Sequence, residues 1–145
     1  MILLVGLPGS GKSTWALRQG LPVLSSDAMR GTLADDVRDQ SIHGRVFASL
    51  RYLIRQRVAI GRPVTCVDAT HLTRKERKPY FRIRRCQVEA VFFDTPLEIC
   101  QARNRARDRV VPPEIIDSMA VKMTPPSLEE GFALITVVRP SMAAA

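Results

Sequence analysis

The sequence contains no run of apolar residues long enough to cross a membrane, since none reaches the roughly 18 residues that a membrane-spanning helix needs. The apolar start, residues 1–5, is too short for a secretory signal peptide and has no charged leader. We therefore expect a cytoplasmic protein. With 145 residues, of which 46% are apolar, the chain is expected to form a single domain, residues 1–145, with a substantial core.

The sequence is also poor in cysteine and in acidic residues. Its three cysteines, Cys66, Cys86 and Cys100, lack the spacing of a metal site, so we expect reduced thiols, with Cys66 and Cys100 in the core. Lysine and arginine number 22 against 14 aspartates and glutamates, which gives a net charge of +8. That excess favours an anionic partner, although a soluble basic protein that binds no polymer has the same composition.

Strand-like runs alternate with helical ones, which is typical of a parallel sheet with helices on both faces. Apolar runs bounded by turn residues predict strands at 2–5, 23–26, 64–67, 88–93 and 134–138. Helical spacing and helix breakers predict helices at 12–19, 42–60, 96–105 and 112–123, and a basic helical segment at 73–85 interrupted at Pro79. The tail, residues 141–145, is expected to fray.

One glycine-rich segment carries a phosphate-binding motif. Residues 6–13, GLPGSGKS, match G-x-x-x-x-G-K-[ST] in full, with an apolar strand before the motif and a helix after it. Glycines let backbone N–H groups point at phosphates, the lysine reaches the β- and γ-phosphates, and the hydroxyl is a Mg²⁺ ligand. We therefore predict binding of ATP or another nucleoside triphosphate with Mg²⁺. The predicted nucleotide-binding residues are Gly9, Ser10, Gly11, Lys12, Ser13 and Thr14.

A carboxylate follows the third predicted strand. Asp68 stands where it can hold Mg²⁺ together with the Ser13 hydroxyl, because carboxylates at strand ends share the ligand edge of a parallel sheet. The alternative is that Asp68 caps the next turn. We interpret Ser13 and Asp68 as the metal-binding residues.

Three segments of the sequence carry a family resemblance. They are residues 6–16, the segment SDAMR at 26–30, and the segment VDAT at 67–70. They resemble the polynucleotide 5′-hydroxyl kinases, a family that includes the phage end-healing kinase and the kinase domain of bacterial polynucleotide kinase–phosphatases. The bacterial group is the closer match, through residues 30–31, 35–36, 39–40, 77–79, 101–104 and 130–132. The resemblance implies an adenylate-kinase-like P-loop NTPase fold. This is an α/β three-layer sandwich with four or five parallel strands in the order 2-3-1-4-5 and an arginine-bearing lid at about residues 103–112.

The resemblance also implies roles for individual residues. Asp27 corresponds to the base that accepts the proton of the acceptor hydroxyl, and Arg30 grips the phosphate beside the reacting nucleotide. From spacing alone, the favoured interpretation is that Asp27 caps a short helix and that Arg30 is solvated. Asp68, Thr70 and His71 complete the implied acceptor site, although His71 stands where the bacterial enzymes usually have Asn.

A second group of arginines precedes Pro112. In the alignment Arg107 takes the place of the lid arginine, which stabilises the transferring phosphate, and Arg103 contacts ATP. The neighbours Arg105 and Arg109 are interpreted as cations at a solvated helix end.

The basic segment 73–85 contains Arg74, Lys75, Arg77, Lys78, Arg82, Arg84 and Arg85 against a single acid, Glu76. It suits a sugar–phosphate backbone, but a solvated helix face has the same composition. Tyr80 and Phe81 within it can stack on bases, and packing in the core is the favoured interpretation.

Together these features predict an ATP-dependent polynucleotide 5′-hydroxyl kinase, which transfers the γ-phosphate to 5′-OH ends of DNA or RNA in end repair. Two alternatives stay open. One is a P-loop kinase of a small hydroxylated metabolite or nucleoside, and the other is a nucleotide-binding module without catalysis.

Overall fold

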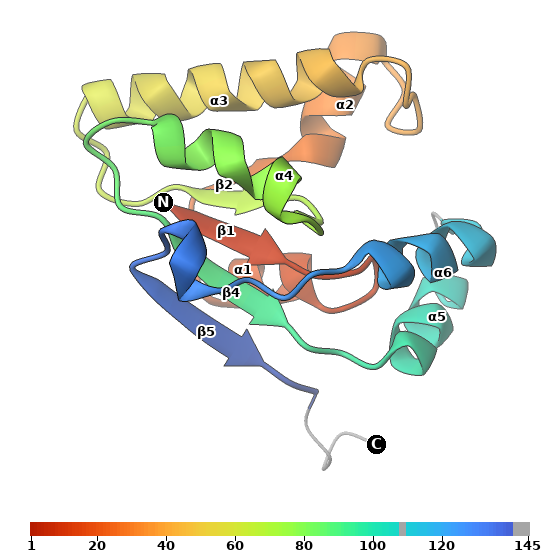
Figure 1. Cartoon of the computed structure of the whole chain (residues 1–145). Helices are drawn as coiled ribbons and strands as arrows, with labels where there is room; N and C mark the ends of the chain where they lie inside the picture. The colour runs from red at the N-terminus through yellow and green to blue at the C-terminus, as the bar shows by residue number, and fades with distance from the viewer. Residues whose placement is uncertain (108–109, 141–145) are drawn as a thin grey trace.

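The computed structural model describes residues 1–107 and 110–140 and is built on one five-stranded sheet in which all neighbouring strands pair in parallel (Figure 1). The strands are β1 (Ile2–Val5), β2 (Val23–Ser25), β3 (Cys66–Asp68), β4 (Glu89–Phe93) and β5 (Leu134–Val138). Their order is β2-β3-β1-β4-β5, so the predicted fold class and strand order are confirmed. The tail that was expected to fray, residues 141–145, and Arg109 lie outside the described residues.

Helices cover both faces of the sheet and its carboxyl end (Figure 1). The α-helices are α1 (Lys12–Arg18), α2 (Ser26–Ala34), α3 (His43–Ala59), α4 (Arg74–Arg77), α5 (Leu97–Arg105) and α6 (Pro113–Lys122). Two 3₁₀ helices are η1 (Lys78–Arg82) and η2 (Leu128–Glu130). Among the described residues, no helix has the length and apolar character needed to cross a membrane.

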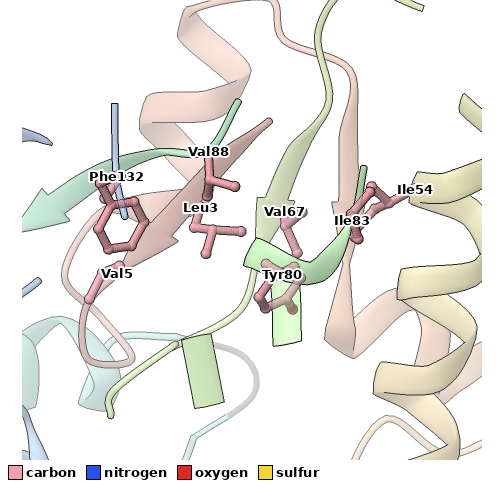
Figure 2. Packing of buried hydrophobic residues seen from close by; sticks show 9 residues of the cluster. Leu3, Val5, Ile54, Val67, Tyr80, Ile83, Val88 and Phe132 are labelled. Carbon is pink, nitrogen blue, oxygen red and sulfur yellow. The ribbon is translucent and has the colours of Figure 1, made fainter. Parts of the chain in front are cut away.

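Alternation along the central strand divides the core between the two faces, because successive side chains of a strand point in opposite directions. Leu3 and Val5 of β1 pack on one face with Ile54 of α3 and with Tyr80 and Ile83 from the η1 segment (Figure 2). On the opposite face, Leu4 packs with Ala16 of α1, and Trp15 packs edge-on against Phe93 at a ring distance of 5.8 Å. Cys66 and Cys100 are buried, as predicted.

Two predicted boundaries shift for local reasons. Residue 26 was predicted as the end of a strand, but it is the first residue of α2, a helix that the sequence analysis did not assign. The Ser25 hydroxyl accepts a hydrogen bond from the Ala28 N–H at 3.2 Å and so caps this helix. The third strand begins at Cys66 rather than at residue 64, where the Val64 carbonyl instead accepts a hydrogen bond from the Arg57 guanidinium at 2.8 Å.

The basic segment 73–85 forms two short helices, α4 and η1, and its central arginine points into the protein. Arg77 is fully buried, and its Nε and Nη2 donate to the two carboxylate oxygens of Glu130 at 2.8 and 3.0 Å. Its Nη1 donates to the carbonyls of His71 and Thr124 at 2.8 and 3.0 Å. Arg77 therefore ties the segment to the chain that precedes β5, and its guanidinium does not face solvent.

The two aromatic residues of the segment also belong to the core. Tyr80 is only 1% exposed, and Phe81 packs edge-on against Phe132 at a ring distance of 4.8 Å. The favoured interpretation of these rings as core residues is confirmed, and they do not form a surface for stacking bases.

Replacement of Arg77 by methionine should lower the free energy of unfolding by about 3–5 kcal/mol, because it leaves the Glu130 carboxylate partly buried without its partner. Arg74→Met is the matched control. Arg74 also faces Glu130, but its side chain is 53% exposed, so its loss should cost less than about 1 kcal/mol. Urea unfolding of both variants measures the difference, and equal costs would contradict the structural role of Arg77.

Candidate active site

A cleft of about 800 Å³ lies at the carboxyl end of the sheet. This is the edge at which open parallel sheets bind ligands, because the loops after neighbouring strands meet there. The walls come from the loop after β1, the start of α2, the end of β3, the start of α3 and the chain between α5 and α6. Segments that are far apart in the sequence thus meet in one cavity.

The loop after β1 is shaped by its glycines. Gly9 and Gly11 have φ angles of 81° and 101°, in the left-handed region that residues with a Cβ rarely adopt. A Cβ at Gly9 would also stand 2.6 Å from the carbonyl oxygen of Cys100, so α5 packs directly against the loop. This backbone conformation leaves the N-terminus of α1 open toward the cleft, where an anion is favoured.

Lys12 is folded onto the loop that carries it. Its Nζ is buried and donates to the carbonyls of Gly6 and Leu7 at 2.9 and 2.8 Å. Burial lowers the pKa of Lys12 to about 8, although the nearby Asp68 carboxylate opposes this shift. Phosphate oxygens entering the loop would offer stronger acceptors and a compensating charge.

Ser13 and Asp68 meet because β1 and β3 are neighbours in the sheet. The Ser13 hydroxyl donates to Oδ2 of Asp68 at 2.6 Å. Mg²⁺ prefers oxygen ligands, and in kinase sites it takes one or two from the protein and the rest from phosphates and water. No cluster of three or more His, Cys, Asp or Glu side chains is found among residues 1–107 and 110–140, and the Ser13–Asp68 pair suits a cation that arrives with the nucleotide.

Asp27 and Arg30 lie on the first turns of α2 and face the same cleft as Lys12. Nη1 of Arg30 stands 3.2 Å from Oδ1 of Asp27. The Arg30 side chain is 6% exposed and that of Asp27 is 50% exposed. Within the described part of the chain, the buried Nε of Arg30 has no hydrogen-bond partner. A buried guanidinium with incomplete pairing is costly, and a bound anion beside it would reduce that cost.

The arginines in the last turn of α5 and just after it differ in placement. Nη1 of Arg103 stands 3.4 Å from the carbonyl oxygen of Gly9, and both Arg103 and Arg107 line the cleft. Arg105 is exposed and lies outside the cleft lining. The fully buried Asn104 fixes this segment, since its side chain donates to the Val111 carbonyl and accepts from the Val111 N–H at 2.9 Å.

His71 does not reach the cleft, contrary to the expectation from the sequence. Its ring is 2% exposed, with Nδ1 donating to the Leu4 carbonyl at 2.6 Å and Nε2 accepting from the Tyr80 hydroxyl at 3.0 Å. Burial lowers the pKa of His71 to about 4, so the ring is neutral at physiological pH. The imidazole therefore holds β1 and η1 together, whereas the neighbouring Thr70 does line the cleft.

Several residues that line the cleft were missed by the sequence analysis, four of them in one wall. Arg38, Gln40, His43 and Phe47 form the wall contributed by the chain between α2 and α3 and by the start of α3. The rings of His43 and Phe47 lie 4.7 Å apart. Their spacing of four residues indicates a shared helix face, but nothing in the sequence shows that this face meets the phosphate loop.

The lysines and arginines of the segment 74–78 do not line the cleft either. Arg74 points to Ser127 and Glu129, and Arg77 is buried, so neither offers a free charge to a ligand. Lys75 and Lys78 are exposed outside the cleft lining.

Comparison with known proteins agrees with this geometry. A family model described as an AAA domain matches residues 1–126. The chain belongs to this AAA-domain family. No curated protein matches the chain.

Among solved structures, the chain is similar to a gluconokinase from Sinorhizobium meliloti 1021, with a TM-score of 0.65 and 20% identity over 99% of this chain and 85% of that one. It is also similar to a sugar kinase from Janibacter sp. HTCC2649, with a TM-score of 0.68 and 19% identity over 95% of this chain and 83% of that one. A chain of the Pnkp1/Rnl/Hen1 RNA repair complex matches with a TM-score of 0.69 and 20% identity over 83% of this chain and 42% of that one. These likenesses show that the chain has a P-loop kinase fold.

The lowered pKa of Lys12, about 8, predicts that ATP binding takes up protons. Phosphate charge raises the pKa of the bound lysine, so the free protein gains a proton on binding at pH 8–9, and apparent affinity falls as the pH rises through 8. Calorimetric titration in two buffers of different ionisation enthalpy measures the uptake. Lys12→Arg is the control, because a guanidinium does not titrate in this range and should remove the effect. Equal uptake in both proteins would contradict the assignment.

Proposed function

We propose that the protein is an ATP-dependent polynucleotide 5′-hydroxyl kinase, which transfers the γ-phosphate to 5′-OH ends of DNA or RNA in end repair. One observation carries this proposal. The Asp27–Arg30 pair lies in the same cleft as Lys12 and the Ser13–Asp68 pair, so a proton acceptor and an anion-binding group face the phosphate loop.

The reaction assigns one task to each group. The acceptor oxygen attacks the γ-phosphorus, the bond from that phosphorus to the β–γ bridging oxygen breaks, ADP leaves, and the hydroxyl proton passes to the Asp27 carboxylate. Lys12 releases the loop carbonyls and holds the β- and γ-phosphate oxygens. Ser13 and Asp68 would hold Mg²⁺, which would supply positive charge at the same phosphates when bound.

Two arginines complete the proposed site. Arg30 holds the phosphate on the 3′ side of the reacting nucleoside, which places the 5′ oxygen beside Asp27. Arg107 faces the cleft and lies close enough to Lys12 to influence its ionisation, a position suited to the charge that develops on the transferring phosphate. Arg103, at the start of the expected lid segment, lies beside Gly9 of the phosphate loop and contacts the bound nucleotide there.

A second candidate is a kinase of a small hydroxylated metabolite. The gluconokinase and the sugar kinase match this chain over 99% and 95% of its length, which favours a site for a small acceptor. The buried, incompletely paired Arg30 suits an anionic small molecule as well as a nucleic-acid phosphate.

The experiment that separates the two candidates follows a labelled γ-phosphate from ATP, in the presence of Mg²⁺, to 5′-OH DNA and RNA oligonucleotides, to nucleosides and to gluconate. Transfer to oligonucleotide ends supports the proposal. Transfer to gluconate or a free nucleoside, with none to oligonucleotides, supports the second candidate.

The substitution Asp27→Asn should reduce kcat by about 10²- to 10⁴-fold and leave ATP affinity near that of the wild type, because the amide preserves shape but accepts no proton. Single-turnover transfer and nucleotide titration measure the two quantities separately. The neighbouring Thr32→Val, at an exposed position of the same helix, is the control and should retain wild-type kcat. A loss below about fivefold in Asp27→Asn would show that this carboxylate is not the proton acceptor.

A further inference from the structure

A row of side chains leads out of the cleft along α3. His43, Phe47, Arg51 and Arg55 recur at every fourth position, so they share one side of the helix. The first two line the cleft, whereas the two arginines lie farther along the helix and outside the cleft lining. The row thus begins with the aromatic rings of His43 and Phe47 at the cleft and continues with Arg51 and Arg55 outside it.

The side of α3 that carries these arginines is next to η1. Ile54 of α3 packs in one cluster with Tyr80 and Ile83 of the η1 segment, and Figure 2 shows these side chains on the same face of the sheet. Burial raises the pKa of Tyr80, the charge of Arg51 opposes this shift and the charge of Glu76 adds to it, so both Arg51 and Glu76 lie near η1.

The η1 side contributes further cations. Tyr80, Ile83 and Arg77 point inward, whereas Lys75, Lys78 and Arg82 are exposed, as are Arg74 and Glu76 of α4. We call the five residues Arg51, Arg55, Lys75, Lys78 and Arg82 the basic stripe. Its residues belong to α3, α4 and η1, and Figure 1 shows α3 beside the α4–η1 segment.

Cations outnumber carboxylates along the basic stripe. Neither α3 nor η1 contains an acidic residue. The acid of α4, Glu76, is exposed and accepts a hydrogen bond from the Leu72 N–H at 2.9 Å. Within the described part of the chain, no member of the stripe forms an ion pair with a carboxylate. Unpaired cations gathered on one surface produce a positive potential that attracts a polyanion.

We infer that the basic stripe binds the sugar–phosphate backbone of a single-stranded nucleic acid whose 5′ end occupies the cleft. The inference rests on the proposed function for the identity of the reacting end. The continuity of the stripe with the cleft supports the inference. The stripe begins next to Phe47 and His43 at the edge of the cleft, so one nucleic-acid strand can pass from Arg30 along α3. A backbone contact of this kind is independent of base sequence, since phosphates carry no sequence information.

The test compares a 5′-OH dodecanucleotide with a 5′-OH dinucleotide as acceptors, using the full chain. The wild type should show a lower KM for the dodecanucleotide, and this advantage should fall steeply with salt, by a log–log slope of about −0.7 per phosphate contact. The double variant Arg55→Gln/Lys78→Gln should flatten the slope by about 1.4 and raise the KM of the long acceptor roughly tenfold at low salt. The loss should be confined to the long acceptor.

The matched control removes two charges elsewhere. Arg18→Gln/Lys122→Gln changes exposed residues of α1 and α6, carries the same change in net charge, and should leave the salt slope at its wild-type value. Equal salt slopes in the two double variants would overturn the proposed role of the stripe, because the change in salt dependence would then follow net charge alone. Equal KM values of the wild type for the two acceptors would also overturn it.

Binding without turnover separates this inference from the proposed function. Fluorescence anisotropy of a labelled 5′-phosphorylated dodecanucleotide measures its binding to the stripe even when no phosphate is transferred. Binding that weakens in the stripe variant but not in the control supports the stripe, even if oligonucleotides fail as acceptors and the proposed function is lost. If the protein transfers phosphate to the dinucleotide but oligonucleotide binding does not depend on the stripe, the proposed kinase function stands. The proposal that the stripe binds nucleic acid is then overturned. Binding to vesicles that contain phosphatidylserine, without binding to the oligonucleotide, would overturn it in favour of a membrane surface.

Discussion

The central position of β1 in the sheet is the constraint on which the candidate site depends. Because β1 lies between β3 and β4, the loop that follows it opens beside the ends of both neighbours. Asp68 at the end of β3 thereby meets Ser13, and the helix that follows β4 packs on Gly9 so closely that a Cβ has no room. The phosphate loop is thus held on two sides by the sheet order itself, and its shape is fixed before any ligand enters.

The part of the cleft that contains Asp27 and Arg30 depends on a different feature, the short helix α2 at the end of β2. The Ser25 cap starts this helix at the sheet edge, and three-residue spacing then brings Asp27 and Arg30 onto one face. Arg30 is nearly buried while its partner stays half exposed, so the pair presents a fixed cation and a reachable carboxylate. Under the proposed function, this arrangement would select an acceptor that has an anionic group adjacent to the reacting hydroxyl.

Much of the fold and of the nucleotide half of the site could be predicted from the sequence. The reason is that they rest on local signals: the 6–13 motif, strand alternation, and Asp68 at a strand end. The roles that failed rest on long-range packing. Arg77 and His71 look like surface groups in the sequence, yet Glu130 and the Leu4 carbonyl, distant in the chain, draw them inward. Phe47 was missed for the same reason, because only the approach of α3 brings it to the cleft.

The most direct test of this account is the preference of the protein for a nucleoside 3′-phosphate over the bare nucleoside as acceptor, measured as kcat/KM with labelled ATP. The account predicts that the wild type prefers the phosphorylated form by about 10- to 100-fold, the effect of a charged hydrogen bond, and that Arg30→Ala loses the preference. Equal rates of transfer to both acceptors by the wild type would contradict the central claim that Arg30 holds the phosphate beside the reacting hydroxyl.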